Sequence, residues 1–124
     1  MQDIKFGQYL KMLREARDVT LRELARQTGI SAPYLSDVEN DRTQPLTKDR
    51  LEKVISVLRL SEEEQNQLFD LAGRERKEVA ADLPNYIMGN DFVTAALRTA
   101  RDLKAGEEEW LRFVEELKKR EGQS

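Results

Sequence analysis

The 124-residue chain contains no cysteine and no histidine. The first absence excludes disulfides and thiolate metal sites, and the second removes the commonest metal ligand and the commonest general base. No apolar run approaches the roughly 20 residues that cross a bilayer. The N-terminal ten residues include Asp3 and lack the apolar segment of a signal peptide. We therefore expect a cytoplasmic protein with no metal and no cofactor.

Patterns typical of catalysis are missing as well. Serine nucleophiles have no histidine partner, no glycine-rich phosphate loop occurs, and no paired carboxylates indicate a cleft for acid–base chemistry. The acidic run Glu107–Glu109 is interpreted as the solvated first turn of a helix rather than as a metal site. The sequence predicts a protein that is not an enzyme.

Charge, by contrast, is abundant, with Asp, Glu, Lys and Arg making up 36% of the chain. Residues 1–60 hold 11 basic and 9 acidic side chains, a net of +2, whereas residues 61–124 hold 10 and 15, a net of −5. This asymmetry is typical of a slightly basic first module followed by an acidic part with another role. Such a module is compatible with a nucleic-acid partner, but helical surfaces of mixed charge also occur in proteins that have no such partner.

The spacing of apolar residues is helical throughout, and no segment alternates with period two for long enough to predict a strand. The fold class is therefore predicted to be all-α. The first module is expected to contain five helices: one carrying Phe6, Leu10 and Leu13, a second over Thr20–Gly29, a third from Ser31 to about Asn40, a fourth from about Lys48 through Leu58, and a fifth from Ser61 to Gly73.

The second and third predicted helices are separated by a very short break. Thr20 and Glu23 have the spacing of a capping box, and Gly29 can end the helix in the left-handed conformation. Ser31 then caps a new helix, in whose first turn Pro33 is tolerated because an N–H is not needed there. Two helices joined by such a turn form the helix-turn-helix unit that can enter a major groove.

The second module is predicted to begin after residue 78, because residues 73–82 change from charged to small side chains. In the first module, Ser61 and Glu64 have the spacing of another capping box, at the start of its fifth helix. Residues 79–124 are expected to form a helical hairpin, whose parts are a short turn of helix over Pro84–Met88 closed by Gly89, a helix capped by Asp91, a break at Gly106, a last helix from Glu107 to about Arg120, and a frayed end over residues 122–124. Its apolar stripe is interpreted as core, within one subunit or between two: Trp110, Phe113, Val114 and Leu117.

The run T-L-R-E-L-A-x-x-x-G-I-S-x-x-Y-L-S-x-V-E-N, preceded by F-x-x-x-L-x-x-L-R, resembles the Cro/repressor-type (XRE) helix-turn-helix family over about residues 4–73. The resemblance implies a lambda-repressor-like, five-helix domain over residues 1–78 that binds double-stranded DNA. Its third helix would read the major groove, and the protein would act as a homodimer on a palindromic operator.

The resemblance also implies roles for individual residues by matched position. The family's base-reading positions correspond to Ala32, Pro33, Ser36 and Asp37. Its phosphate or groove-edge contacts correspond to Ser31 and Tyr34. DNA-backbone contacts are expected from Arg22, Asn40, Arg42, Lys48 and Arg50. Arg14 and Glu39 match an ion pair that ties the first helix to the third.

The chain departs from the family pattern at Leu21, where the family often has glutamine, and at Asp41, where it often has glycine. The reading positions are also chemically poor. Ala32 and Pro33 can only touch a thymine methyl group, and Asp37 can accept from a cytosine amino group but repels phosphates. We therefore expect modest affinity per domain, most of it from backbone contacts.

The sequence predicts a sequence-specific transcriptional regulator, with repression as the expected direction. Three roles remain open for residues 79–124. They can hold two copies together, they can bind another protein, as in antitoxins that neutralise a toxin and repress their own operon, or they can form a small-ligand pocket. Homodimerisation is the leading hypothesis, because a 46-residue piece is marginal alone and two half-sites multiply the affinity.

Overall fold

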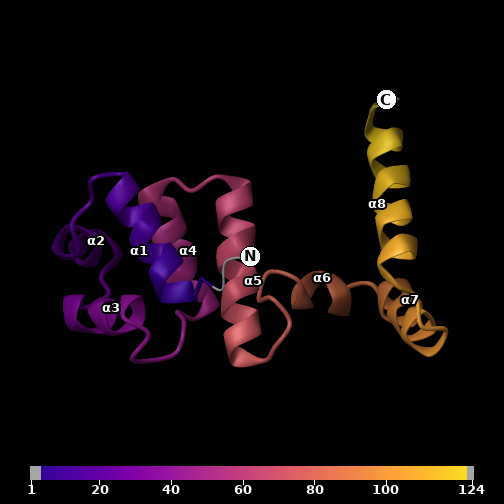
Figure 1. The fold of residues 1–124 in the computed structure, drawn as a ribbon, viewed down its shortest axis with the longest axis horizontal. Coiled ribbons are helices and arrows are strands. Elements are labelled where there is room, and N and C mark those ends of the chain that lie inside the picture. Colours follow the sequence, from indigo (N-terminus) through magenta and orange to yellow (C-terminus); the bar gives the residue numbers. More distant parts are fainter. Residues whose placement is uncertain (1–3, 123–124) are drawn as a thin grey trace. The chain divides into compact units, whose positions relative to one another are not determined.

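A computed structural model describes residues 4–122, and every regular element in that range is a helix (Figure 1). The all-α prediction is confirmed. Asp3 and residues 123–124 lie outside the described part. The helices are α1 (Phe6–Ala16), α2 (Leu21–Thr28), α3 (Ala32–Glu39), α4 (Lys48–Leu58), α5 (Glu62–Arg76), α6 (Pro84–Met88), α7 (Asp91–Asp102) and α8 (Glu107–Gly122).

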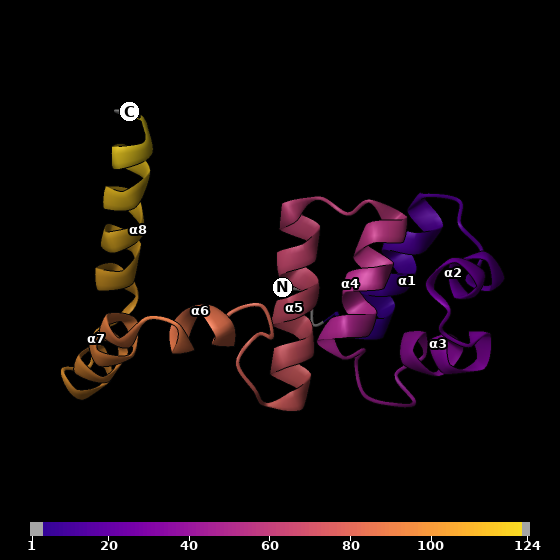
Figure 2. The same cartoon turned by 180° about the vertical axis from the view of Figure 1, so that it is seen from behind.

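The chain divides into two units, Met1–Pro84 and Asn85–Ser124. In the first unit, α1 packs against α3 and α5, while α2 packs against α3 and α4. Both α2 and α3 lie on the side of this unit away from α5 (Figures 1 and 2). The apolar stripes of the five helices meet in one core, whose fully buried side chains are Phe6, Leu10, Leu24, Leu35, Val38, Leu46, Leu51, Val54 and Leu68.

The turn between α2 and α3 is formed as predicted. Gly29 ends α2 with φ of 75°, a conformation that glycine adopts without strain. The Ser31 hydroxyl accepts a hydrogen bond from the Tyr34 N–H at 3.3 Å, and Pro33 lies in the first turn of α3.

Only half of the capping box predicted at α2 is present. The Thr20 hydroxyl accepts from the Glu23 N–H at 3.0 Å. The Glu23 carboxylate, however, accepts from Arg26 and Gln27, so it does not reach back to the helix start. The Arg26 hydrogen bond lowers the pKa of Glu23. At α5 the reciprocal box is complete, with Ser61 and Glu64 bonded in both directions.

The prediction that α5 ends at Gly73 is wrong, because the helix continues to Arg76 and ends at Lys77 with φ of 59°. Gly73 is needed for packing instead. A Cβ atom there would lie 2.8 Å from the Glu78 carbonyl oxygen. The chain after α5 folds back, and Ala80 and Ala81 pack against the core. These residues belong to the compact unit Met1–Pro84.

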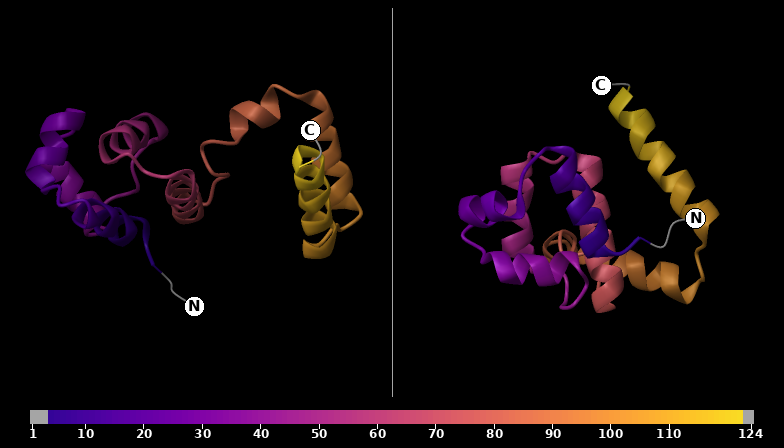
Figure 3. Two further views of the ribbon diagram at one scale, coloured as in Figure 1. Left: turned by 90° about the horizontal axis from the view of Figure 1, so that it is seen from above. Right: turned by 60° about the vertical axis from the view of Figure 1, so that its left-hand side comes forward.

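The second unit contains α7, α8 and all of α6 except Pro84, and none of these helices has a buried residue. The N-cap of α7 is Asn90 and not Asp91 as predicted, and the Asn90 side-chain amide donates to the Tyr86 carbonyl at 2.7 Å. Gly106 precedes α8 as expected, and its N–H donates to Glu109 at 2.6 Å, which lowers the pKa of Glu109. The right-hand view of Figure 3 shows α7 and α8 diverging from the turn that joins them.

No helix within residues 4–122 combines the length and apolar character needed to cross a membrane. In the same described range, no group of three or more carboxylate side chains is placed to hold a metal ion.

Candidate nucleic-acid interface

Helix α3, the predicted reading helix, has one buried side and one side that faces solvent. Leu35 and Val38 on the back are 0% and 1% exposed. Of the predicted base readers, Pro33 is exposed, and the other three are half-buried: Ala32, Ser36 and Asp37. Ser31, a predicted phosphate or groove-edge contact, is exposed. The helix is therefore anchored from beneath while its predicted reading side reaches solvent.

An ion pair fixes the buried end of α3 to α1, as the resemblance implied. The Arg14 guanidinium donates from Nε to Glu39 at 2.7 Å and from Nη2 to the other carboxylate oxygen at 2.8 Å. Its Nη1 donates to the Val19 carbonyl at 2.8 Å. The hydrogen bond to Glu39 raises the pKa of Arg14. A two-pronged pair in this buried position holds the orientation of α3.

At the C-terminal end of α3, four predicted DNA-contacting residues contact each other in two pairs. Arg42 lies 3.5 Å from the Asp37 carboxylate, and the Asn40 side-chain amide donates to the Ser36 carbonyl at 2.8 Å. The positive charge of Arg42 offsets the repulsion that Asp37 would exert on phosphates. The sequence did not reveal this pairing, although the spacing of five residues across a helix end is compatible with it.

Tyr34 and Arg50 form a third pair, between α3 and α4. The Arg50 guanidinium lies 5.0 Å from the centre of the Tyr34 ring and donates to its hydroxyl at 3.5 Å. This contact is a cation–π interaction in a partly solvated position. The structure thus brings together two predicted contacts that stand 16 residues apart.

The loop that follows α3 is held by residues that the sequence analysis missed. Asp41 takes the left-handed conformation, with φ of 59°, and accepts from the Gly7 N–H at 3.3 Å. Arg76 donates to the Pro45 carbonyl of this loop. Nearby, the Phe6 N–H donates to Glu75 at 2.6 Å and joins α1 to α5. In the sequence, Gly7 interrupts an otherwise regular helical pattern. A glycine at such a position can indicate that another segment of the chain approaches the helix closely.

Arg22 and Lys48, the remaining predicted backbone contacts, stand at the first turns of α2 and α4. Arg22 is exposed and Lys48 is half-buried.

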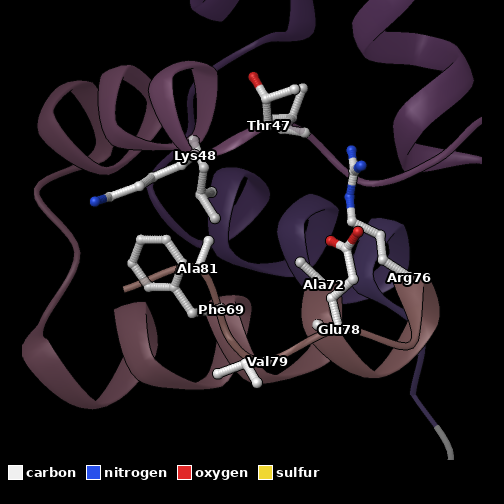
Figure 4. A pocket seen from close by; sticks show the side chains of 11 residues that line it. Thr47, Lys48, Phe69, Ala72, Arg76, Glu78, Val79 and Ala81 are labelled. Carbon is white, nitrogen blue, oxygen red and sulfur yellow. The ribbon is translucent and has the colours of Figure 1, made fainter. Parts of the chain in front are cut away.

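Lys48 borders a small cavity of about 170 Å³ between α4 and α5, lined also by Leu51, Phe69 and Ala81. Its ammonium group points away from the cavity (Figure 4). All residues lining this cavity belong to the first unit, so it is not the pocket that was considered for the hairpin.

Residues 5–68 match the profile of the family described as "Helix-turn-helix domain", which is more than half of the 124-residue chain. The chain belongs to the helix-turn-helix family. The resemblance noted from the sequence is thereby confirmed, and α2, the Gly29–Ser31 turn and α3 are the unit that gives the family its name.

Two relatives of this helix-turn-helix protein come from two strains of Mycobacterium tuberculosis, and each is named an uncharacterized HTH-type transcriptional regulator. Each is 39% identical over 57 residues, which cover 46% of this chain. The matched region spans 40% of the length of these relatives. A chain of the SinR protein/SinI protein complex aligns with 94% of this chain and 98% of its own length, at 23% identity and a TM-score of 0.49.

Proposed function

We propose that this helix-turn-helix protein acts as a sequence-specific DNA-binding transcriptional regulator and not as an enzyme. The observation that carries the proposal is the α2–turn–α3 unit, with α3 anchored by Leu35 and Val38 and its predicted reading side open. A helix held in this way can insert into a major groove about 12 Å wide.

In the proposed complex, Ala32, Pro33, Ser36 and Asp37 meet the base edges. The surrounding residues contact the sugar–phosphate backbone: Arg22, Ser31, Tyr34, Asn40, Arg42, Lys48 and Arg50. Backbone contacts set position and contribute most of the affinity, whereas the base contacts select the sequence. The pairing of Asp37 with Arg42 supports this assignment, because it brings a carboxylate to the groove together with a neutralising charge.

We further propose that the protein represses transcription as a homodimer on a palindromic operator. The poor chemistry of the reading positions supports this, since a single weakly reading domain gains affinity when a second copy engages a half-site about 34 Å away. The second unit also supports it, because the apolar side chains on α7 and α8 remain exposed within one chain.

An antitoxin-like role is the alternative, and the same exposed apolar side chains would then contact a different protein. Purification from the native host discriminates between the two proposals. A stoichiometric second protein that releases on denaturation supports the alternative, whereas a purified preparation containing only this chain, as a dimer, contradicts it.

The DNA proposal is tested by selecting a binding site from random duplexes and measuring affinity for it against salt concentration. Arg22→Gln and Arg42→Gln should each weaken binding and lower the slope of log affinity against log salt by about one. Arg59→Gln is the matched control, because Arg59 is also exposed but lies at the opposite end of α4 from Lys48. Equal slopes in all three variants would show that DNA binds elsewhere.

A further inference from the structure

Helix α8 carries an apolar face that stays substantially exposed in the described chain. Its side chains Trp110, Phe113, Val114 and Leu117, here termed the α8 stripe, are 40–52% exposed. The rings of Trp110 and Phe113 meet edge to face, with centroids 6.4 Å apart and planes at 74°. The stripe is thus a continuous apolar surface on one side of the helix, and it loses water only when another surface packs on it.

The α8 stripe is symmetric about the point midway between residues 113 and 114. Trp110 and Leu117 lie at equal distances from that point, and Phe113 and Val114 adjoin it. When two copies of such a helix lie antiparallel with this point on a two-fold axis, Trp110 meets the partner's Leu117 and Phe113 meets the partner's Val114. Each contact then occurs twice, as in every isologous interface.

Charged residues flank the stripe at equal distances from the same midpoint. Those on the N-terminal side are acidic, and their counterparts on the C-terminal side are basic. Glu107 precedes the stripe by three residues, and Arg120 follows it by three. Glu109 and Lys118 likewise lie at equal distances from the midpoint. In an antiparallel pair each acidic residue of one copy meets a basic residue of the other. In a parallel pair acid would meet acid and base would meet base, which is destabilising.

We infer that α8 pairs antiparallel with the α8 of a second copy, about a two-fold axis between Phe113 and Val114. The inference rests on the proposed homodimer and specifies its surface and direction. The occupant is a second copy because the stripe and its charges complement themselves, which an unrelated partner would not require. Exposed apolar side chains of α7, such as Phe92 and Leu97, offer further area in the same unit.

Disulfide trapping tests the direction of the α8 pairing. Because the sequence contains no cysteine, only the introduced thiols can react. Two chains of different length, one with Glu107→Cys and one with Arg120→Cys, are mixed and oxidised. In the antiparallel pair these positions lie at the same level along the two helices, so the mixed disulfide should dominate. Each variant alone should cross-link poorly, because the two copies of position 107 would lie about 20 Å apart at 1.5 Å per residue.

Charge reversal tests the same contact without a covalent trap. Glu107→Lys and Arg120→Glu should each raise the dimer dissociation constant roughly tenfold, since each change places two like-charged pairs in the interface. The double variant Glu107→Lys/Arg120→Glu should recover most of the loss. Recovery can come only from pairing between copies, because both changes oppose the helix dipole of α8. Sedimentation equilibrium measures all four chains.

The outcomes separate this inference from the proposed function. Strong self-cross-linking of Glu107→Cys, with little mixed product, would overturn the antiparallel pairing while the homodimer stands. A chain that binds its selected site as a monomer would overturn both the pairing and the homodimer. A dimer with the mixed disulfide and with recovery in the double variant supports the inference.

Discussion

At the scale of single residues, Gly7 determines how closely α1 approaches the end of α3. A Cβ atom at this position would lie 2.1 Å from the Val38 carbonyl oxygen and 2.8 Å from that of Glu39. Both obstacles are backbone atoms, which cannot rotate away as a side chain can. Helix α3 can therefore hold its present position only with glycine at residue 7.

Gly7→Ala is expected to destabilise the fold by about 1–3 kcal/mol, the usual range for overpacking, even though alanine favours helices more than glycine does. Gly122→Ala is the matched control, since nothing lies within 4 Å of a Cβ at that helical glycine. Urea unfolding followed by circular dichroism measures both. Equal midpoints would contradict the close approach of α1 and α3.

The buried ion pair of Arg14 and Glu39 leads to a second expectation. Arg14→Met leaves the Glu39 carboxylate buried without its partner, and we expect a loss of about 3–5 kcal/mol in the free energy of unfolding. The double variant Arg14→Met/Glu39→Leu should recover much of that loss, because the unpaired charge is gone. Urea titration of the wild type, both single variants and the double variant completes a double-mutant cycle. Additive losses would show that the two side chains do not interact.

At the scale of elements, the start of α5 contains a titratable cap. The hydrogen bond from the Ser61 N–H, assisted by the Arg17 guanidinium, lowers the pKa of Glu64 below its ordinary value of 4.5. A carboxyl group with a lowered folded-state pKa stabilises the fold fully above its unfolded-state pKa. That stabilisation is lost as the pH falls through the folded-state value.

Wild type should accordingly be more stable than Glu64→Gln at pH 7, and the difference should shrink as the pH falls from about 5 to 3. Glutamine keeps the reciprocal cap but cannot ionise or pair with Arg17. Thermal melts of both chains across this pH range measure the difference. A difference that does not vary with pH would show that the ionised carboxylate contributes nothing at this cap.

At the scale of the whole molecule, the buried core lies in the first unit, and the second unit consists of helices with exposed apolar side chains. We expect a chain ending at Pro84 to unfold cooperatively, because every residue of the core cluster is retained. It should bind the selected operator 10²–10⁴-fold more weakly than the full chain, as expected when two linked half-site contacts become independent. Binding titrations against full and half operators measure this, and unchanged affinity would contradict a dimerising role for the second unit.

The helix-turn-helix frame could be predicted from the sequence because its signals are local. Gly29 at a helix end, Ser31 at the next helix start and apolar residues at helical spacing each act within a few positions along the chain. The boundaries that were predicted wrongly, at Gly73 and Asp91, depend on what packs or bonds there. Gly73 resembled a helix end, but its actual neighbour is the returning chain at Glu78.

The all-α class, the two short helices and their tight turn follow from the sequence, because each depends on backbone preferences and helical periodicity. The close approach of Gly7 to Val38, the stacking of Arg50 on Tyr34 and the exposure of the α8 stripe became known from the folded chain. The physical reason is that close packing and long-range pairing depend on distances between segments far apart in the chain, and local patterns carry no information about those distances.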